Sequence, residues 1–175
     1  AAGGAVRTLA GDMLVRTNGD LTLSSSSSLK ADAGDLIVST EGVGNFINNA
    51  NASALSAGSG KRWLVYSSTP DLVAGAHTVK GGLTSAFRHF GATYATYAPG
   101  SVTESGNGFI YQDVPGVLTV SAAINGSATH IYGDNPTGTL TYVISAGQLD
   151  SEDTAANVIN GGTATYSQAL SNTMN

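Results

Sequence analysis

The sequence predicts an all-β protein whose main part is a right-handed parallel β-helix. Its 175 residues include 23 glycines and are only 11% charged, and Gly, Asn and Asp recur too often for a long element to form. The segments between these turns are short, alternate between apolar and polar residues, and show no helical periodicity. Short strands broken by turns at regular intervals are typical of a solenoid, in which stacked rungs share one core.

A Gly-Asp turn followed by an apolar-x-apolar strand is repeated in the first part of the chain, at Gly11–Val15, Gly19–Leu23 and Gly34–Val38. Successive side chains of a strand face opposite ways. One apolar set is therefore expected to point into the coil, namely Leu21, Leu23, Leu36 and Val38. The residues between them, Thr22 and Ile37, are expected to point outward.

Further strand signals extend the predicted rungs over residues 1–67. They lie at Ala5–Leu9, Ser28–Ala31, Phe46–Asn48, Ala54–Ser56 and Trp63–Tyr66. The serine run at 24–28 is either a flexible linker or a corner of the coil, and the strand signals on both sides of it favour the corner.

The segment Lys61–Ser68 marks the junction between the rungs and the irregular part of the chain. It contains the only tryptophan of the chain. Its strand carries large side chains on both faces, which predicts that both faces are covered. Trp63 and Tyr66 are therefore the expected junction residues. An exposed Trp63 would instead be a platform for sugar stacking, but its apolar neighbours favour a core position.

Residues 68–115 predict an irregular, aromatic-rich segment that caps the solenoid. Prolines and paired glycines interrupt it, and short strands are expected only at Ala92–Tyr97 and Phe109–Gln112. A solenoid end exposes apolar rungs and unpaired strand edges. The aromatic side chains of this segment are therefore expected to fold over the last rungs near Trp63; they are Phe87, Phe90, Tyr94, Tyr97, Phe109 and Tyr111.

Residues 116–175 predict a second, small β module. Alternating strand signals lie at Val117–Val120, Leu140–Ile144 and Thr163–Tyr166, with a turn at Tyr132–Pro136 and one helical turn at Asp150–Ala156. No closing strand signal comes after them, so the module is expected to be incomplete. The first residues contain no basic and apolar leader, which indicates a piece cut from a longer polypeptide.

The run from about Phe46 to Tyr111 resembles the end of the β-helix in filamentous-haemagglutinin-like adhesins, the large exoproteins of bacterial two-partner secretion. The matching segments are Phe46–Asn49, Ala52–Gly60, Arg62–Ser67, Pro70, Gly81–Leu83, Ala92–Tyr94 and Gly106–Tyr111. The part from Ser121 resembles the small MBG or YDG-type modules that follow such β-helices, through Tyr132–Pro136, Leu140–Tyr142, Asp153–Ala155 and Gly161.

The resemblance implies a non-enzymatic segment of a secreted protein of the bacterial cell surface, with a role in cell adhesion or biofilm. It implies an outer-membrane transporter as the partner for export. Through the parent protein it implies a host-cell receptor, a glycan or a biofilm polysaccharide as the binding partner. No cofactor is expected.

Charge and composition argue against several other classes of function. The net charge is −5, and only seven residues are basic, whereas nucleic-acid binding needs a basic surface that neutralises phosphates. No apolar run reaches the length of a membrane-spanning helix, so no membrane insertion is expected. The chain has no cysteine, which excludes disulfides, thiolate metal sites and cysteine nucleophiles.

Two rival functions remain open, and neither has a strong motif. A β-helix enzyme that cleaves polysaccharides would use carboxylates on neighbouring rungs, and the candidates are Asp12, Asp20 and Asp35. Their place after glycine favours an ordinary turn role, so no catalytic residue is expected. A carbohydrate-binding module would use the aromatic-rich segment 87–111, with Tyr94, Tyr97 and Tyr111 as contacts.

The remaining candidate sites have a simpler interpretation. His77, His89 and His130 are far apart and lack metal-ligand spacing, so no metal site is expected. Asp150, Glu152 and Asp153 are interpreted as a solvated turn or helix start. Asn51 and Asn125 begin N-glycosylation sequons, for which chance is the favoured explanation in a chain so rich in Asn and Ser.

Overall fold

The structure is a computed structural model that describes residues 4–71, 77–114, 120–125 and 139–144. The described residues fall into two compact units. The first contains the strands β1 to β10, and the second contains β11 and β12.

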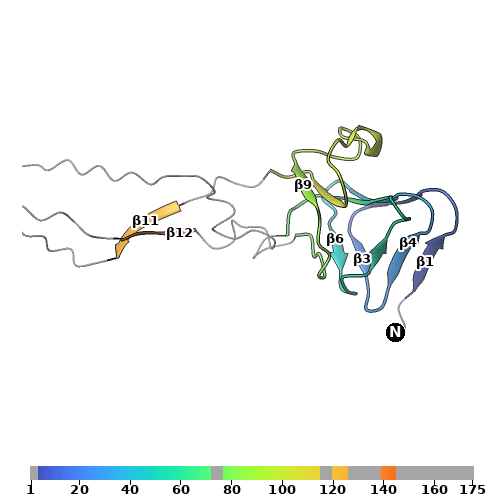
Figure 1. Cartoon of the computed structure of the whole chain (residues 1–175), viewed down its shortest axis with the longest axis horizontal. Helices are drawn as coiled ribbons and strands as arrows, with labels where there is room; N and C mark the ends of the chain where they lie inside the picture. The colour runs from blue at the N-terminus through green and yellow to red at the C-terminus, as the bar shows by residue number, and fades with distance from the viewer. Residues whose placement is uncertain (1–3, 72–76, 115–119, 126–138, 145–175) are drawn as a thin grey trace, which may run out of the picture. The chain divides into compact units, whose positions relative to one another are not determined.

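The first unit is a parallel β-solenoid of about four turns, as predicted (Figure 1). One sheet consists of β1 (Ala5–Thr8), β4 (Ser28–Ala31) and β7 (Leu55–Ser56). A second pairs β3 (Leu21–Leu23) with β6 (Phe46–Asn48), and Val79 bridges to Ile47 beside them. The third and largest has the order β2 (Met13–Asn18), β5 (Leu36–Glu41), β8 (Trp63–Ser67), β10 (Gly108–Tyr111) and β9 (Phe87–Phe90).

The Gly-Asp repeats mark two different corners of the coil. Met13 pairs with Leu36, so the turn before β2 is equivalent to the turn before β5. Leu21 pairs instead with Phe46. The counterpart of the turn at 19–20 is therefore Gly44-Asn45, in which asparagine stands where the earlier rung has aspartate. The serine run forms the corner between β3 and β4, where the Ser27 N–H donates to the Ser24 carbonyl.

The corner side chains brace one rung to the next. Asp12 Oδ1 accepts a hydrogen bond from the Asp35 N–H at 2.8 Å, and Asp35 Oδ1 accepts one from the Arg62 N–H at 2.9 Å. At the second corner, Asp20 Oδ1 accepts from the Asn45 N–H at 2.8 Å, and Asn45 Oδ1 accepts from the Thr69 N–H at 2.9 Å. Each side chain thus satisfies a backbone donor that the turn leaves outside the strand ladder.

Replacing Asp35 by alanine is expected to lower the free energy of unfolding by about 1 kcal/mol, because the Arg62 N–H loses its acceptor. Asp35→Asn keeps the Oδ1 acceptor and is expected to cost less than half as much. Urea unfolding followed by circular dichroism measures both. Equal losses in the two variants would show that the carboxylate charge, rather than the hydrogen bond, is what the corner needs.

The interior of the coil is filled with apolar and aromatic side chains. Leu23, Leu36 and Val38 are buried as predicted. Leu21 is half-buried, and its strand β3 pairs with β6 alone among the described strands. Thr22 is exposed, as predicted. The aromatic part of the core is continuous: the Phe109 ring centroid lies 5.2 Å from that of Trp63 and 5.9 Å from that of Tyr111, and Phe90 stacks on Tyr111 at 5.5 Å.

The segment 68–115 contributes more regular structure than its composition indicates. Its strands β9 and β10 extend the largest sheet, and β10 lies between β8 and β9 although it comes after both in the chain. Residues 91–107, here called the outer loop, connect β9 to β10. The predicted strand at Ala92–Tyr97 is wrong: these residues form a turn, in which the Tyr97 N–H donates to the Thr93 carbonyl and Thr96 Oγ1 accepts from the Thr93 N–H.

The second unit, as far as it is described, is an antiparallel pair of strands. β11 (Val120–Asn125) pairs with β12 (Thr139–Ile144), with Val120 opposite Ile144 and Asn125 opposite Thr139. The strand predicted at Leu140–Ile144 lies within β12. The signal at Val117–Val120 overlaps β11 only at its last residue. The predictions at Tyr132–Pro136, Asp150–Ala156 and Thr163–Tyr166 lie outside the described residues.

Candidate functional site

The outer face of the largest sheet carries a second apolar cluster. Ile37, Leu64, Tyr66 and Ile110 point outward from β5, β8 and β10, and they are buried because Ala92 and Val102 of the outer loop pack over them, with Tyr94 and Tyr97 at the margin. Ile37 therefore has the predicted outward direction but is not solvent-exposed. This covered outer face is the part of the described chain where polar and aromatic side chains from several strands converge.

Arg62 holds the outer loop against the sheet. Its Nη1 donates to the Glu104 carbonyl at 2.6 Å. Its Nη2 donates to the carbonyls of Pro99 and Val102 at 3.2 and 3.1 Å. One guanidinium therefore donates to three carbonyl groups of an irregular segment. Arginine suits this role because its several N–H donors are held in a fixed planar geometry.

An ionisable network also holds the outer loop, through the Glu104 side chain. His89 Nδ1 lies 2.8 Å from Glu104 Oε1, and the Tyr97 hydroxyl donates to Glu104 Oε2 at 2.7 Å. The His89 ring stacks on the Tyr97 ring at 4.4 Å. The hydrogen bond from His89, followed by that from Tyr97, lowers the pKa of Glu104 from 4.5 to about 2. The network therefore holds a carboxylate that stays ionised in acid.

A carboxyl group whose pKa is lower in the folded protein than in the unfolded chain stabilises the fold above the unfolded pKa. The Glu104 contribution is expected to be complete above pH 4.5 and to disappear as the pH falls towards 2. Glu104→Gln should remove this part of the acid sensitivity, so its midpoint temperature should fall less steeply than that of the wild type over this range. Thermal unfolding at a series of pH values measures it. Parallel curves for the two proteins would contradict the role given to Glu104.

A pocket opens where the outer loop meets the outer face. Its volume is about 260 Å³. Thr93, Tyr94 and Ala95 form one wall. Ala92 also belongs to the outer loop, and the other lining residues come from β2, from β5 and its following turn, from β8 and from the residue after β10: Arg16, Ser39, Thr40, Glu41, Gly42, Tyr66, Ser67 and Gln112. The Arg16 guanidinium is paired with Glu41 and lies 4.7 Å from the centroid of the Tyr94 ring. The pocket thus combines an aromatic ring with both hydrogen-bond donors and acceptors.

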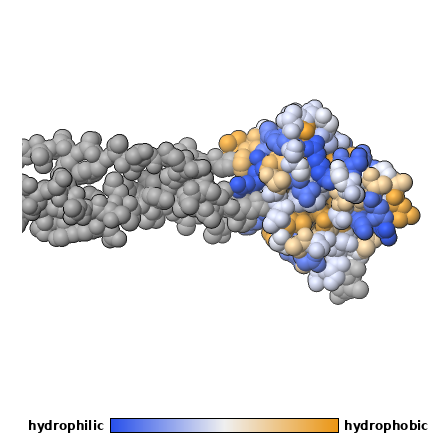
Figure 2. Space-filling model, viewed as in Figure 1, coloured by the Kyte–Doolittle hydropathy of each residue, from blue (hydrophilic) through white to orange (hydrophobic). Residues whose placement is uncertain are grey.

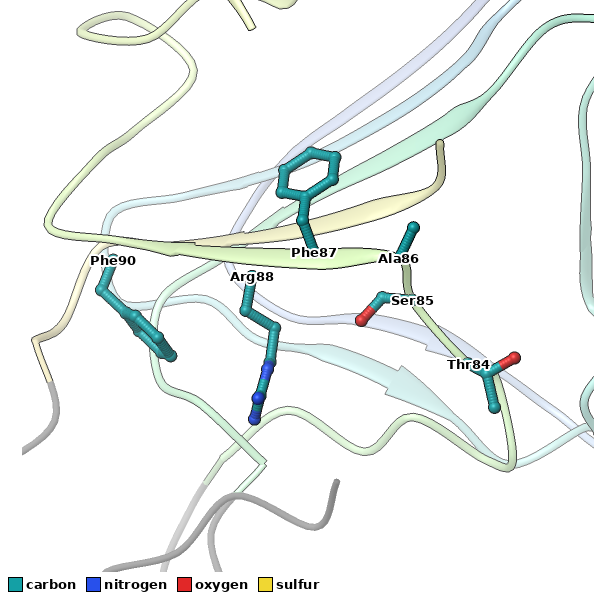
Figure 3. Close-up of a pocket in the computed structure, with 6 residues that line it drawn as sticks. All are labelled: Thr84, Ser85, Ala86, Phe87, Arg88 and Phe90. Atoms are coloured by element: carbon teal, nitrogen blue, oxygen red, sulfur yellow. The ribbon is translucent and has the colours of Figure 1, made fainter. Parts of the chain in front are cut away.

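A second hollow of about 420 Å³ lies along β9 (Figure 3). It is lined by Thr84, Ser85, Ala86, Phe87, Arg88 and Phe90. Figure 3 shows Phe87 on one side of the strand and Arg88 with Phe90 on the other. This is the alternation of a strand with two covered faces: Phe87 joins the outer cluster, and Phe90 joins the interior core.

The structure places the predicted aromatic residues in three different environments. Trp63 and Tyr66 are buried, on the inner and outer faces of β8 respectively. Burial raises the pKa of the Tyr66 hydroxyl, which donates to the Tyr97 carbonyl at 2.8 Å. Tyr94 and Tyr97 are partly exposed on the outer loop. Tyr111 lies inside the coil with no exposed surface, so it presents nothing to a sugar.

The two sequons differ in what the structure describes. Asn51 is exposed in a turn, where its Oδ1 accepts a hydrogen bond from the Ser53 N–H at 2.7 Å. Asn125 is the last residue of β11, and its side chain lies outside the described part. Glycosylation at either position stays a prediction.

The histidines have separate neighbours. His77 Nε2 lies 3.7 Å from Asp71 Oδ1, His89 contacts Glu104, and His130 lies outside the described residues. Within residues 4–71 and 77–114, no three His, Asp or Glu side chains are grouped so that they could share a metal ion. The same part of the chain contains no helix that is long and apolar enough to cross a membrane.

Sequence reasoning missed Ser39, Arg62 and Glu104 as parts of this site. Arg62 had a signal, since it stands directly before the only tryptophan. Ser39 and Glu104 had none, because a serine in a strand and a glutamate in a polar loop are ordinary. Their roles depend on how the outer loop folds back over the sheet.

Comparison with known proteins adds no relative. No protein-family model, curated protein or solved structure matches the chain. The resemblance to filamentous-haemagglutinin-like adhesins therefore rests on the sequence motifs alone.

Proposed function

We propose that this chain is a non-enzymatic structural and adhesive segment of a large secreted protein of the bacterial cell surface. The observation that carries the proposal is the way in which polar side chains are used. Asp12, Asp20, Asp35 and Asn45 bind backbone N–H groups of the next rung. Side chains that could serve chemistry are instead engaged in holding rungs together, over a filled core, as a rigid stalk requires.

The surface of the solenoid unit fits the same role. Figure 2 shows a face that is mostly pale or hydrophilic, with scattered apolar patches. Among the described residues, the large apolar side chains that are exposed are few: Val6, Leu9, Leu14, Val43 and Val114. A surface with few exposed apolar side chains offers few binding sites of its own. A solenoid with such a surface suits the role of a spacer between binding sites elsewhere in the parent protein.

The sequence resemblance supplies the finer part of the proposal. It places the segment in an exoprotein that leaves the cell through an outer-membrane transporter and binds a host-cell receptor, a glycan or a biofilm polysaccharide. In this arrangement the solenoid gives length and stiffness, and the following module continues the array. No nucleic acid and no membrane insertion enter this role.

The test is made on cells that produce the parent protein. Antibodies raised against the purified 175-residue chain should label intact cells, and deletion of the proposed outer-membrane transporter should abolish the labelling while the protein remains detectable inside. An in-frame deletion of the segment should reduce attachment to a surface. Labelling only after the cells are broken open would reject the surface assignment, and release of products from a polysaccharide by the purified chain would reject the non-enzymatic one.

A further inference from the structure

One residue that lines the outer-face pocket has a hydroxyl with no hydrogen-bond partner among the described groups. Ser39 is only 1% exposed, and its Oγ has no hydrogen-bond partner in the structure. It lies in the middle of an outward-facing row, with Arg16 of β2 on one side and Tyr66 of β8 on the other. Buried hydroxyl groups are nearly always paired, so an unpaired one beside a pocket indicates a partner from outside the chain, either a water molecule or a ligand.

The size of the pocket limits what that partner can be. Its volume of about 260 Å³ is room for roughly eight water molecules at about 30 Å³ each. It lies just below the range of about 300–1,000 Å³ typical of sites for drug-sized ligands. A single sugar ring fits this space, whereas a peptide strand or a nucleotide exceeds it.

The lining of the pocket matches the chemistry of a sugar. Hydroxyl groups of a pyranose both donate and accept, and the pocket offers the Ser39 hydroxyl, the Arg16 donors, the Glu41 carboxylate and the Gln112 amide. The wall contributes the Tyr94 ring, an apolar body against which the C–H groups of a sugar can pack.

The charges in the pocket favour a neutral ligand. Arg16 is the only cationic residue among the lining residues, and Glu41 already neutralises it. Its guanidinium also lies over the Tyr94 ring. An anionic sugar would have to break the ion pair and would leave Glu41 facing another negative charge. A neutral hydroxyl can join the pair without separating it.

We propose that this pocket binds one neutral pyranose residue of a glycan, with a sugar hydroxyl bound to Ser39 Oγ. Tyr94 packs beside the ring, and Arg16, Glu41 and Gln112 bind the hydroxyls at the rim. This binding site goes beyond the structural role proposed for the chain and does not depend on it, because a rigid stalk does not require a sugar-binding pocket.

The test is a titration of the whole chain, labelled with ¹⁵N, with the methyl glycosides of glucose, galactose, mannose and N-acetylglucosamine, and with methyl glucuronide as the anionic probe. At least one neutral glycoside should shift the amide signals of Ser39, Tyr94 and Gln112 with a millimolar Kd, and the glucuronide should bind more weakly. No shift at these amides with any neutral probe up to tens of millimolar, or preference for the glucuronide, would overturn the proposal.

Two serine variants then separate binding from folding. Ser39→Ala removes a hydroxyl that has no partner in the free protein, so its midpoint temperature should equal or exceed that of the wild type. Its affinity for the same glycoside should be roughly tenfold lower, the effect of one lost hydrogen bond. Ser101→Ala, at an exposed position of the outer loop outside the pocket, should leave both quantities unchanged. Unchanged affinity in Ser39→Ala would exclude Ser39 as the contact and reject the site.

Discussion

Replacing Trp63 by alanine is expected to lower the free energy of unfolding by roughly 3–5 kcal/mol. The side chain is only 4% exposed and pairs with Leu36 on the rung before it. Its ring meets the edge of Phe109 on the next strand of the sheet, with the centroids 5.2 Å apart. Truncation therefore opens a cavity between two rungs, at a cost that is a large share of the ~5–15 kcal/mol that stabilises a domain.

The substitution is expected to affect the two ends of the solenoid unequally. Phe109 lies on β10, so loss of its aromatic neighbour should weaken the docking of β10 and β9 before it weakens the earlier rungs. The variant should keep much of its β signal in circular dichroism but self-associate through freed strand edges. Trp63→Phe preserves an aromatic contact and serves as the control, with a much smaller loss. In the wild type the single tryptophan should emit at short wavelength, and a red-shifted, readily quenched emission would refute its burial.

Replacing Gly34 by alanine is expected to cost roughly 3 kcal/mol, at the upper end of the range for overpacking. Gly34 packs directly against the backbone of Gly11 and Asp12, which form the corresponding corner of the preceding rung. An added Cβ would overlap the Gly11 carbonyl and would stand 2.5 Å from the Asp12 nitrogen. Both neighbours are backbone atoms, which cannot rotate away as a side chain can. The rungs would have to separate at this corner and strain the hydrogen bond from the Asp35 N–H to Asp12.

Gly100→Ala is the matched control. No atom lies within 4 Å of a Cβ added to Gly100, and its φ is outside the left-handed region. The same substitution there should be neutral or should stabilise by up to about 1 kcal/mol, because alanine restricts the unfolded chain. Urea unfolding of both variants gives the comparison. Equal midpoints would show that the close approach of the two corners does not limit the stacking.

The rungs were predictable from sequence because their signals are local. Gly-Asp before an alternating strand is enough to locate β2, β3 and β5, and the apolar residues at 23, 36 and 38 are buried accordingly. The equivalence of the repeats was not predictable, since asparagine at position 45 takes the role that aspartate has at position 20. Only the register of the strands reveals that correspondence.

The candidate site could be predicted only in part. The sequence marked the aromatic segment 87–111 and Trp63, but it did not show that Tyr111 points into the coil while Tyr94 stays at the surface. The turn at 92–97 resembles a strand in sequence because Thr and Tyr favour strands. The hydrogen bonds between Thr93 and Thr96 compete with that preference. The position of β10 between β8 and β9 has no local signal at all.

That strand order determines how the end of the solenoid can be assembled. β2, β5 and β8 are added in chain order, so each finds its partner already in place when the polypeptide emerges from its N-terminus. β9 does not, because among the described strands it pairs only with β10, which is made after the whole outer loop. Arrival of β10 is therefore expected to complete the sheet, to let the outer loop cover its outer face and to bring Glu104 to His89 in one cooperative step. We therefore expect folding in chain order to give way here to a single concerted step, whose rate depends on the most distant pairing in the sheet, that of β8 with β10, rather than on the next residue to appear.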